Sequence, residues 1–366
     1  MTDALVGHGP RAARAGPLTA ARLLRIELRR TAMLWMLPLL AALFWFSTYR
    51  PGMALPPWWN LRGTMLQQQG LLVFAPLVAG AAAWMGSREG RRGIADLVGA
   101  TALPRWAGQL AAWAATTCWA MVAYLGGVAV VYGITARQAT WGGPLWWPVA
   151  VGAATVAASC ALGFAAGALL PGRFSAPLVA VAVFLALGTG AIAIEHNSTY
   201  AQIWPLNVQG ALPPDAFGVF SPYLHDLAIT QVLFLAGLAA AVLGGLGLRP
   251  AAGGRWLRYA AAVAAAAGLA AAGTGVGLAG TARLEANGIV IPALHDAAND
   301  ERIAYTPVCG QAAVPVCLHP AYRLLVPAVT AALGPVLSEV AGLPGAPVRV
   351  SQAAITHMRQ QPPQRR

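Results

Sequence analysis

The chain contains no lysine, because all 24 of its basic residues are arginine. A Walker A loop needs a lysine that reaches the β- and γ-phosphates of ATP. Schiff-base and lysine-nucleophile chemistry need a lysine as well. All three are therefore excluded for this chain. Acidic residues are also scarce, and charged residues of both signs make up only 10% of the sequence, against about 25% in a soluble domain.

Hydrophobic residues, by contrast, make up 58% of the chain, and its mean hydropathy is +0.60. Long uncharged apolar runs recur, and runs of about 20 apolar residues are typical of membrane-spanning helices. The sequence therefore predicts an all-α polytopic membrane protein, with the lipid bilayer as its surroundings and no nucleic acid as partner. Seven candidate spans cover residues 31–49, 67–86, 107–134, 146–170, 176–194, 227–248 and 257–280.

None of these seven spans carries Asp, Glu, Arg or His well inside it. Ionisable residues within a span mark proton relays, ion pathways and voltage sensors. This pattern argues against a proton-coupled antiporter, a pump and a gated ion channel. If the chain moves a compound, we expect the energy to come from another chain.

The arginines are distributed unequally between the two sides of the predicted membrane. With the N-terminus inside, most arginines fall in the inner segments, and only Arg50, Arg62 and Arg137 fall in the outer loops. Positive residues gather in the cytoplasmic loops of membrane proteins. We therefore expect a cytoplasmic N-terminus and, after seven spans, an extracellular tail over residues 281–366. The abundance of Ala, Gly, Arg and Pro is typical of a GC-rich genome, and we expect a bacterial cell membrane.

The tail holds two cysteines, Cys309 and Cys317, in short β-prone runs on either side of a Gly-containing turn. An extracellular compartment permits a disulfide bond between them, so we expect a small disulfide-stapled α+β domain. A metal site, or a Cys–His nucleophile that includes His319, is the alternative, although the paired spacing typical of zinc sites is missing. In a cytoplasmic tail, a free pair or half a metal site would be favoured.

Other parts of the tail predict short elements. Pro327 and Pro335 interrupt the apolar stretch 321–341 and favour two short helices over one. Residues 347–351 favour a strand, and the polar end 357–366 is expected to be disordered.

The segment between the second and third spans, residues 88–104, predicts a short amphipathic helix on the cytoplasmic surface. Its apolar face, at helical spacing, comprises Ile94, Leu97, Val98 and Thr101, and its charged residues are Arg88, Arg91, Arg92 and Asp96. A solvated loop that binds lipid headgroups is the alternative interpretation. Residues 18–30 predict a second, basic amphipathic helix that lies on the inner leaflet, unless they are simply a positively charged flank.

The order of residues in the first of these segments follows a recognisable pattern: Glu, then Arg-Gly, then an acidic residue and Leu, then a Thr-Pro-x-x-Arg ending. The matching positions hold Glu89, Arg92, Gly93, Asp96, Leu97, Thr101 and Arg105. This pattern resembles the coupling helix of the ABC exporter permeases of the second class, which are small permeases with six spans per subunit. Asp96 replaces the commoner Glu, and Ala102 stands where the family usually has Pro.

The resemblance implies a six-span permease core over residues 31–248, with the coupling helix at 88–104 docking on a separate ATP-binding subunit. It also implies a second permease copy or homologue, and an interfacial helix within the N-terminal segment 1–30. The outer segment 195–226 lies where the family carries a helical hairpin. A loop and seventh span, 249–280, and an extracellular domain, 281–356, go beyond the family plan.

The expected function is therefore ATP-driven export of an amphiphilic or hydrophobic compound. The chain itself is expected to be no enzyme and to hold no cofactor, since the partner ATPase would bind ATP and Mg. Two other functions are open: a non-transporting membrane anchor that displays the tail as a sensor or binding module, and an enzyme with its site in the tail.

Overall fold

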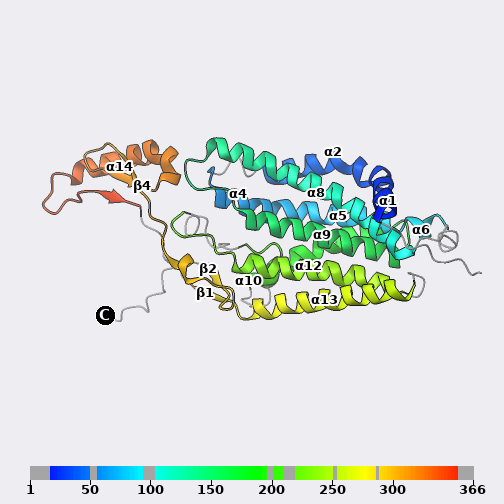
Figure 1. The fold of residues 1–366 in the computed structure, drawn as a ribbon. Helices are drawn as coiled ribbons and strands as arrows, with labels where there is room; N and C mark the ends of the chain where they lie inside the picture. The colour runs from blue at the N-terminus through cyan, green and yellow to red at the C-terminus, as the bar shows by residue number, and fades with distance from the viewer. Residues whose placement is uncertain are drawn as a thin grey trace, which may run out of the picture.

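The computed structural model describes residues 17–49, 56–93, 104–195, 202–208, 219–249, 254–285 and 288–352. Long helices form a bundle, and a small tail of strands and short helices lies at one end of it (Figure 1). We call this the tail end of the bundle. The opposite end, which carries α1 (Pro17–Arg30) and α6 (Arg88–Arg91), is called the α1 end.

Within the described residues, the bundle contains seven helical segments at the positions of the seven predicted spans. They are α2 (Met33–Phe44) with the π-helical turn η1 (Trp45–Tyr49); α4 (Trp59–Met65), η2 (Leu66–Gly70) and α5 (Leu71–Gly86) as one segment; α8 (Arg105–Gln138); α9 (Trp146–Leu169); α10 (Ser175–Glu195); α12 (Asp226–Gly247); and α13 (Arg255–Gly280).

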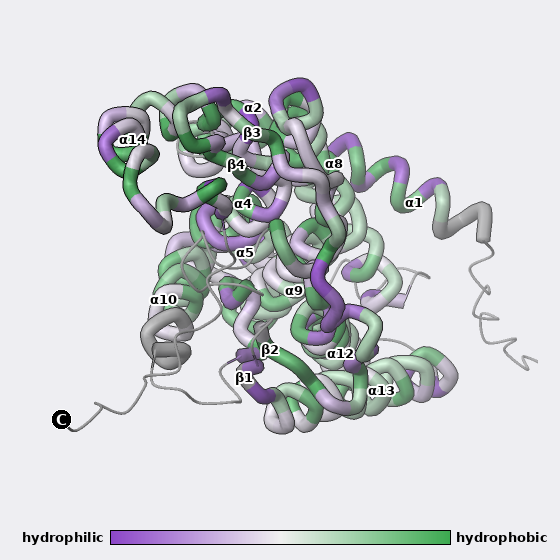
Figure 2. Tube along the Cα trace, turned by 90° about the vertical axis from the view of Figure 1, so that its left-hand side faces the viewer, coloured by the Kyte–Doolittle hydropathy of each residue, from purple (hydrophilic) through white to green (hydrophobic). Residues whose placement is uncertain are grey.

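Five of these segments are long and apolar enough to cross a membrane on their own, which supports a membrane-embedded protein. The first is bent by 59° from α1, and α10 has a shorter described apolar part, Ser175–Gly190. Residues 320–340 are also long and apolar enough, but they belong to the tail (Figure 1). Figure 2 shows α12 and α13 as mainly hydrophobic.

The second span is longer than the sequence predicted. The helical segment begins at Trp59 and not at residue 67, so it includes Arg62, which was predicted in an outer loop. The Arg62 side chain is only 2% exposed and donates to Thr135 Oγ1 at 3.4 Å and Gln138 Oε1 at 3.2 Å, both on α8. Polar partners on the neighbouring helix allow the charged residue within the segment.

Small residues explain why the Ala/Gly-rich seventh segment packs as a helix. A Cβ atom added to Gly244 of α12 would lie 2.5 Å from Ala265 N, and one added to Gly268 of α13 would lie 2.6 Å from Gly237 O. The backbones of α12 and α13 are therefore in direct contact, as is typical of helix pairs in membranes.

The described residues of the tail form two small sheets. β1 (Arg283–Glu285) pairs with β2 (Gly288–Val290) antiparallel, and β3 (Val308–Gly310), β4 (Val316–Leu318) and β5 (Val350–Ser351) form the second sheet in the order β3-β4-β5. β3 and β4 are antiparallel, whereas β4 and β5 are parallel. The strand predicted over 347–351 is present only at its end, as the two-residue strand β5. The 3₁₀ helix η4 (Ala297–Asp300) lies between the sheets in sequence.

Two helices cover the stretch 321–341: the 3₁₀ helix η5 (Pro320–Leu325) and the α-helix α14 (Val326–Val340) meet beside Pro327, as predicted, whereas the expected interruption at Pro335 is not present. Pro327 lies in the first turn, where a backbone N–H has no intrahelical partner. Pro335 lies inside α14 and removes one backbone hydrogen bond. The helix continues past it, because Leu337 is buried against Val314 and Val316 beside the second sheet.

The tail is attached to the bundle by specific contacts. Trp58 Nε1 donates to Ala321 O at 3.0 Å, and Thr140 Oγ1 donates to Pro320 O at 2.8 Å. Both acceptors belong to η5, and both donors lie at the tail end of span segments. These hydrogen bonds therefore hold the tail against the bundle, in addition to its covalent connection to α13.

A candidate coupling surface at the α1 end

The α1 end of the bundle carries the residues predicted to couple the chain to a partner. Hydrophilic and hydrophobic residues alternate along α1 (Figure 2), as expected for a helix at a membrane surface. Trp119 Nε1 of α8 donates to Leu28 O at 2.9 Å, and the Thr31 and Thr116 hydroxyls lie 3.3 Å apart. The C-terminal end of α1 is thus fixed on α8.

The helix predicted over 88–104 is not continuous. α6 ends at Arg91, and Gly93 adopts a left-handed conformation with φ = 64°, which interrupts a right-handed helix. Glycine takes this conformation without the steric cost that a Cβ atom imposes. Residues 94–103, with Asp96 and Leu97, lie outside the described residues, so the predicted apolar face and the pairing of Arg92 with Asp96 stay predictions.

Arg88 of α6 forms a bidentate ion pair with Glu27 of α1. Arg88 Nη2 lies 2.6 Å from Glu27 Oε1, and Arg88 Nη1 lies 2.7 Å from Glu27 Oε2. The side chains are only 24% and 11% exposed. The hydrogen bonds with Glu27 raise the pKa of Arg88. Two parallel bonds fix distance and orientation together, so α6 and α1 are held as one unit.

Two further contacts fasten α6 to its surroundings. Arg105 Nε, in the first turn of α8, donates to Glu89 Oε2 at 3.2 Å. A Cβ atom added to Gly90 would lie 2.9 Å from Pro171 Cγ, so α6 also packs on the turn between α9 and α10. This four-residue helix therefore contacts α1, the start of α8 and the turn that precedes α10.

Arg91 and Arg92 differ from Arg88 in that neither is paired with a carboxylate among the described residues. The Arg91 guanidinium lies 3.3 Å from the centre of the Trp84 ring, and it donates to Trp84 O at 2.8 Å and to Ser87 Oγ at 3.0 Å. Partial desolvation lowers the pKa of Arg91. Arg92, in contrast, is exposed. Of the predicted coupling residues that are described, Arg92 and Gly93 are thus the most available to a partner.

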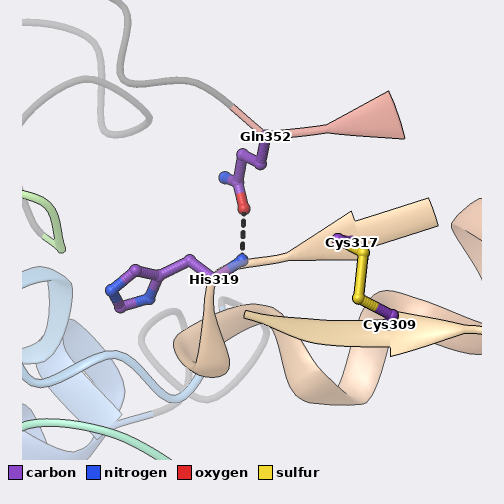
Figure 3. Close-up of a disulfide and its surroundings, with 4 residues drawn as sticks. All are labelled: Cys309, Cys317, His319 and Gln352. Carbon is purple, nitrogen blue, oxygen red and sulfur yellow. Dashed lines mark hydrogen bonds between the residues drawn. A yellow bond between two sulfur atoms is a disulfide. The ribbon is translucent and has the colours of Figure 1, made fainter. Parts of the chain in front are cut away.

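The predicted disulfide is present in the tail. Cys309 and Cys317 face each other across β3 and β4, with Cα atoms 4.0 Å apart (Figure 3). His319 follows two residues later and points away from the disulfide (Figure 3). Its side chain is fully buried, and its ring lies 4.2 Å from Tyr305 and 5.0 Å from Trp141 between centroids.

The environment of His319 is that of a packed side chain. Nδ1 accepts from Ala321 N at 3.2 Å, and the backbone N of His319 donates to Gln352 Oε1 at 3.0 Å (Figure 3). Burial lowers the pKa of the imidazole. Within the described ranges, no three His, Cys, Asp or Glu side chains lie close enough together to hold a metal ion.

A second histidine connects the tail to the start of α12. His295 Nδ1 lies 3.2 Å from Asp226 Oδ2, and His295 Nε2 lies 3.1 Å from Asp300 Oδ2. Asp226 is fully buried and also accepts from Ile291 N at 3.1 Å. The hydrogen bond to Asp300, with a smaller contribution from Asp226, raises the pKa of His295.

Sequence reasoning missed a buried polar network near the tail end. Gln67 Nε2 donates to Pro205 O at 2.9 Å and Asn207 O at 3.0 Å, and Gln231 Nε2 donates to Trp204 O at 2.7 Å. The side chains of Gln67 and Gln231 are 1% exposed. These amides fix residues 202–208 between the second span and α12. A glutamine within an apolar run was the signal available in the sequence.

Comparison of the chain with protein-family models, with curated proteins and with solved structures found no match.

Proposed function

We propose that the chain is the permease subunit of an ATP-driven exporter, and that a separate ATPase subunit docks on the surface around α6. The observation that carries this proposal is the attachment of α6 to three elements. Glu27–Arg88 joins it to α1, Glu89–Arg105 joins it to α8, and Gly90 packs on Pro171 before α10.

Because of these contacts, a partner that binds and displaces α6 would move several helices at once. A displacement of α6 moves the ends of α1, α8 and α10 together, because ion pairs and close packing resist separation. α1 leads directly into α2, which extends the movement to the first span. In this proposal, the exposed Arg92 lies at the contact with the ATPase, and the N-terminus and α6 are cytoplasmic, on the side to which most arginines are assigned.

The partner would supply the ATP site, because this chain has no lysine for a Walker A loop. The cargo we propose is amphiphilic or hydrophobic, since the spans are predominantly apolar. A second copy or a homologue of the chain would complete the transporter. The tail would lie outside the cell, where an oxidising environment maintains the Cys309–Cys317 bridge.

The proposal is tested by purifying the full-length chain from its native membranes in a mild detergent and identifying co-purifying proteins by mass spectrometry. A stoichiometric partner with a Walker A loop is expected. Arg92→Glu is expected to release it, whereas Arg255→Glu, an equal charge change at an exposed site at the start of α13, is expected to retain it. Absence of any such partner across several detergents would contradict the proposal.

A membrane anchor that displays the tail is the second candidate. It is favoured by the construction of the tail, which has a disulfide and its own buried residues, Val314, Val316 and Leu337. As an anchor, the chain would function without an ATPase. Deletion of residues 288–366 would then remove all function, and Arg92→Glu would leave it unchanged.

A further inference from the structure

An apolar groove lies on the side of the bundle near the α1 end, between α2, α5 and α10. Its volume is about 460 Å³, and every residue that lines it is uncharged. Gly80 brings α5 and α10 together beside it, because a Cβ atom at Gly80 would lie 3.1 Å from both Ala176 O and Ala180 Cβ. Trp35 and Trp84, which are 85% and 42% exposed, also line the groove. Such exposed tryptophans are typical of the membrane–water interface.

Three arginines lie on the segments that adjoin the α1 end of this groove, α6 and the turn before α10. Arg91 stacks on Trp84, a lining residue. Arg92 follows it, and Arg173 lies in the turn that contacts α6 through Pro171 and Gly90. Arg173 and Arg92 are exposed. Among the described residues none of the three forms an ion pair, whereas Arg88 and Arg105 are paired with glutamates. This corner therefore carries excess positive charge.

We propose that the groove holds an acyl chain of an anionic phospholipid whose phosphate lies between Arg91 and Arg173. The apolar lining matches a hydrocarbon chain, and basic pockets between membrane helices bind anionic headgroups. Guanidinium groups also match the oxygens of a phosphate in geometry. From Trp84 to Leu77 the groove follows α5 for about 10 Å, at 1.5 Å per residue. This inference does not depend on an ATPase partner.

Charge favours a lipid over a second copy of the chain as the occupant. In a two-fold dimer, the same surface of each copy meets the other. An interface centred on this groove would bring the three arginines of each copy toward the same place, and like charges there repel. An anionic headgroup neutralises them instead.

The test is native mass spectrometry of the full-length chain released from vesicles of phosphatidylglycerol and phosphatidylcholine in equal amounts. The wild-type chain is expected to retain phosphatidylglycerol preferentially. Arg91→Gln with Arg173→Gln is expected to reduce this preference about thirty-fold, from the typical contribution of an arginine at an anionic surface. Arg249→Gln with Arg255→Gln removes the same charge at the same end and is the control, with an unchanged preference.

A second variant tests the acyl-chain site while the arginines are left unchanged. Met36 lies half-buried in the groove wall on α2, so Met36→Trp fills the groove and is expected to lower retention of both lipids while all arginines remain. Equal retention of the two lipids by the wild type would overturn the proposal. So would an unchanged preference in the arginine variant, or efficient cross-linking of Trp35→Cys between two copies in membranes.

Discussion

The Glu27–Arg88 ion pair offers the sharpest test of how α6 is held. We expect Arg88→Met to destabilise the chain more than Glu27→Gln does. The first change leaves a carboxylate that is 11% exposed without its guanidinium partner, whereas the second replaces the charge by a neutral amide that still accepts a hydrogen bond. The double variant is expected to be more stable than the sum of the single changes indicates.

The magnitude follows from the geometry and exposure of the pair. A fully exposed ion pair contributes about 0–1 kcal/mol, and breaking a fully buried one costs about 3–5 kcal/mol. This pair is bidentate, at 2.6 and 2.7 Å, and mostly but not completely shielded from water. We therefore expect about 2–3 kcal/mol for Arg88→Met, after reduction for solvent screening, and a coupling energy of about 1.5–2 kcal/mol between the two sites.

The assay is a double-mutant cycle on reversible unfolding in mixed micelles, monitored by tryptophan fluorescence. Arg255→Met, which removes an exposed arginine at the start of α13, is the control for loss of charge at the same end of the bundle. A coupling energy below about 0.5 kcal/mol would refute the reasoning, because contacts that act independently add within that margin. The pair would then not hold α6 against α1.

Three further outcomes are expected. Gly268→Leu destabilises the α12–α13 contact by about 1–3 kcal/mol in the same unfolding assay, whereas Gly273→Leu, with open space around it, does not. Cys309→Ser with Cys317→Ser lowers tail stability by about 2–3 kcal/mol, read as faster limited proteolysis of the tail; equal proteolysis rates would contradict this. The raised pKa of His295 gives stability that is fully present below about pH 6.5 and is lost as pH rises through the folded-state pKa. Limited proteolysis of the tail is therefore expected to become faster as pH rises through this pKa in the wild type, but not in His295→Gln. The same pH dependence in the variant would contradict the role of His295.

The positions of the spans were predictable, because apolar runs of sufficient length have few alternatives to a helix. The disulfide was predictable for a local reason: a turn between two β-prone runs brings Cys309 and Cys317 together. The helix of the second span, however, begins at Trp59, before the predicted start at residue 67. The sequence does not show that Thr135 and Gln138, more than 70 residues away, accept hydrogen bonds from Arg62.

The contacts within the candidate coupling surface were not predictable from its pattern. The pairing of Glu27 with Arg88 was missed although Glu27 is the single acidic residue in a basic helix, a signal that a pairing partner was required. The helix end at Gly93 depends on a backbone conformation that glycine permits but does not impose. The contact of η5 with Trp58 and Thr140 joins residues far apart in sequence, and no local pattern encodes it.

ATP-driven transport by the chain and its co-purified partner in proteoliposomes shows whether α6 couples the partner to the spans. Uptake of a fluorescent amphiphile and ATP hydrolysis are recorded together. We expect Arg88→Glu to retain the partner and its ATP hydrolysis but to lose transport, and we expect the addition of Glu27→Arg to restore transport by re-forming the ion pair in reverse. Undiminished transport by Arg88→Glu alone would contradict the claim that α6 transmits the partner's movement to the spans.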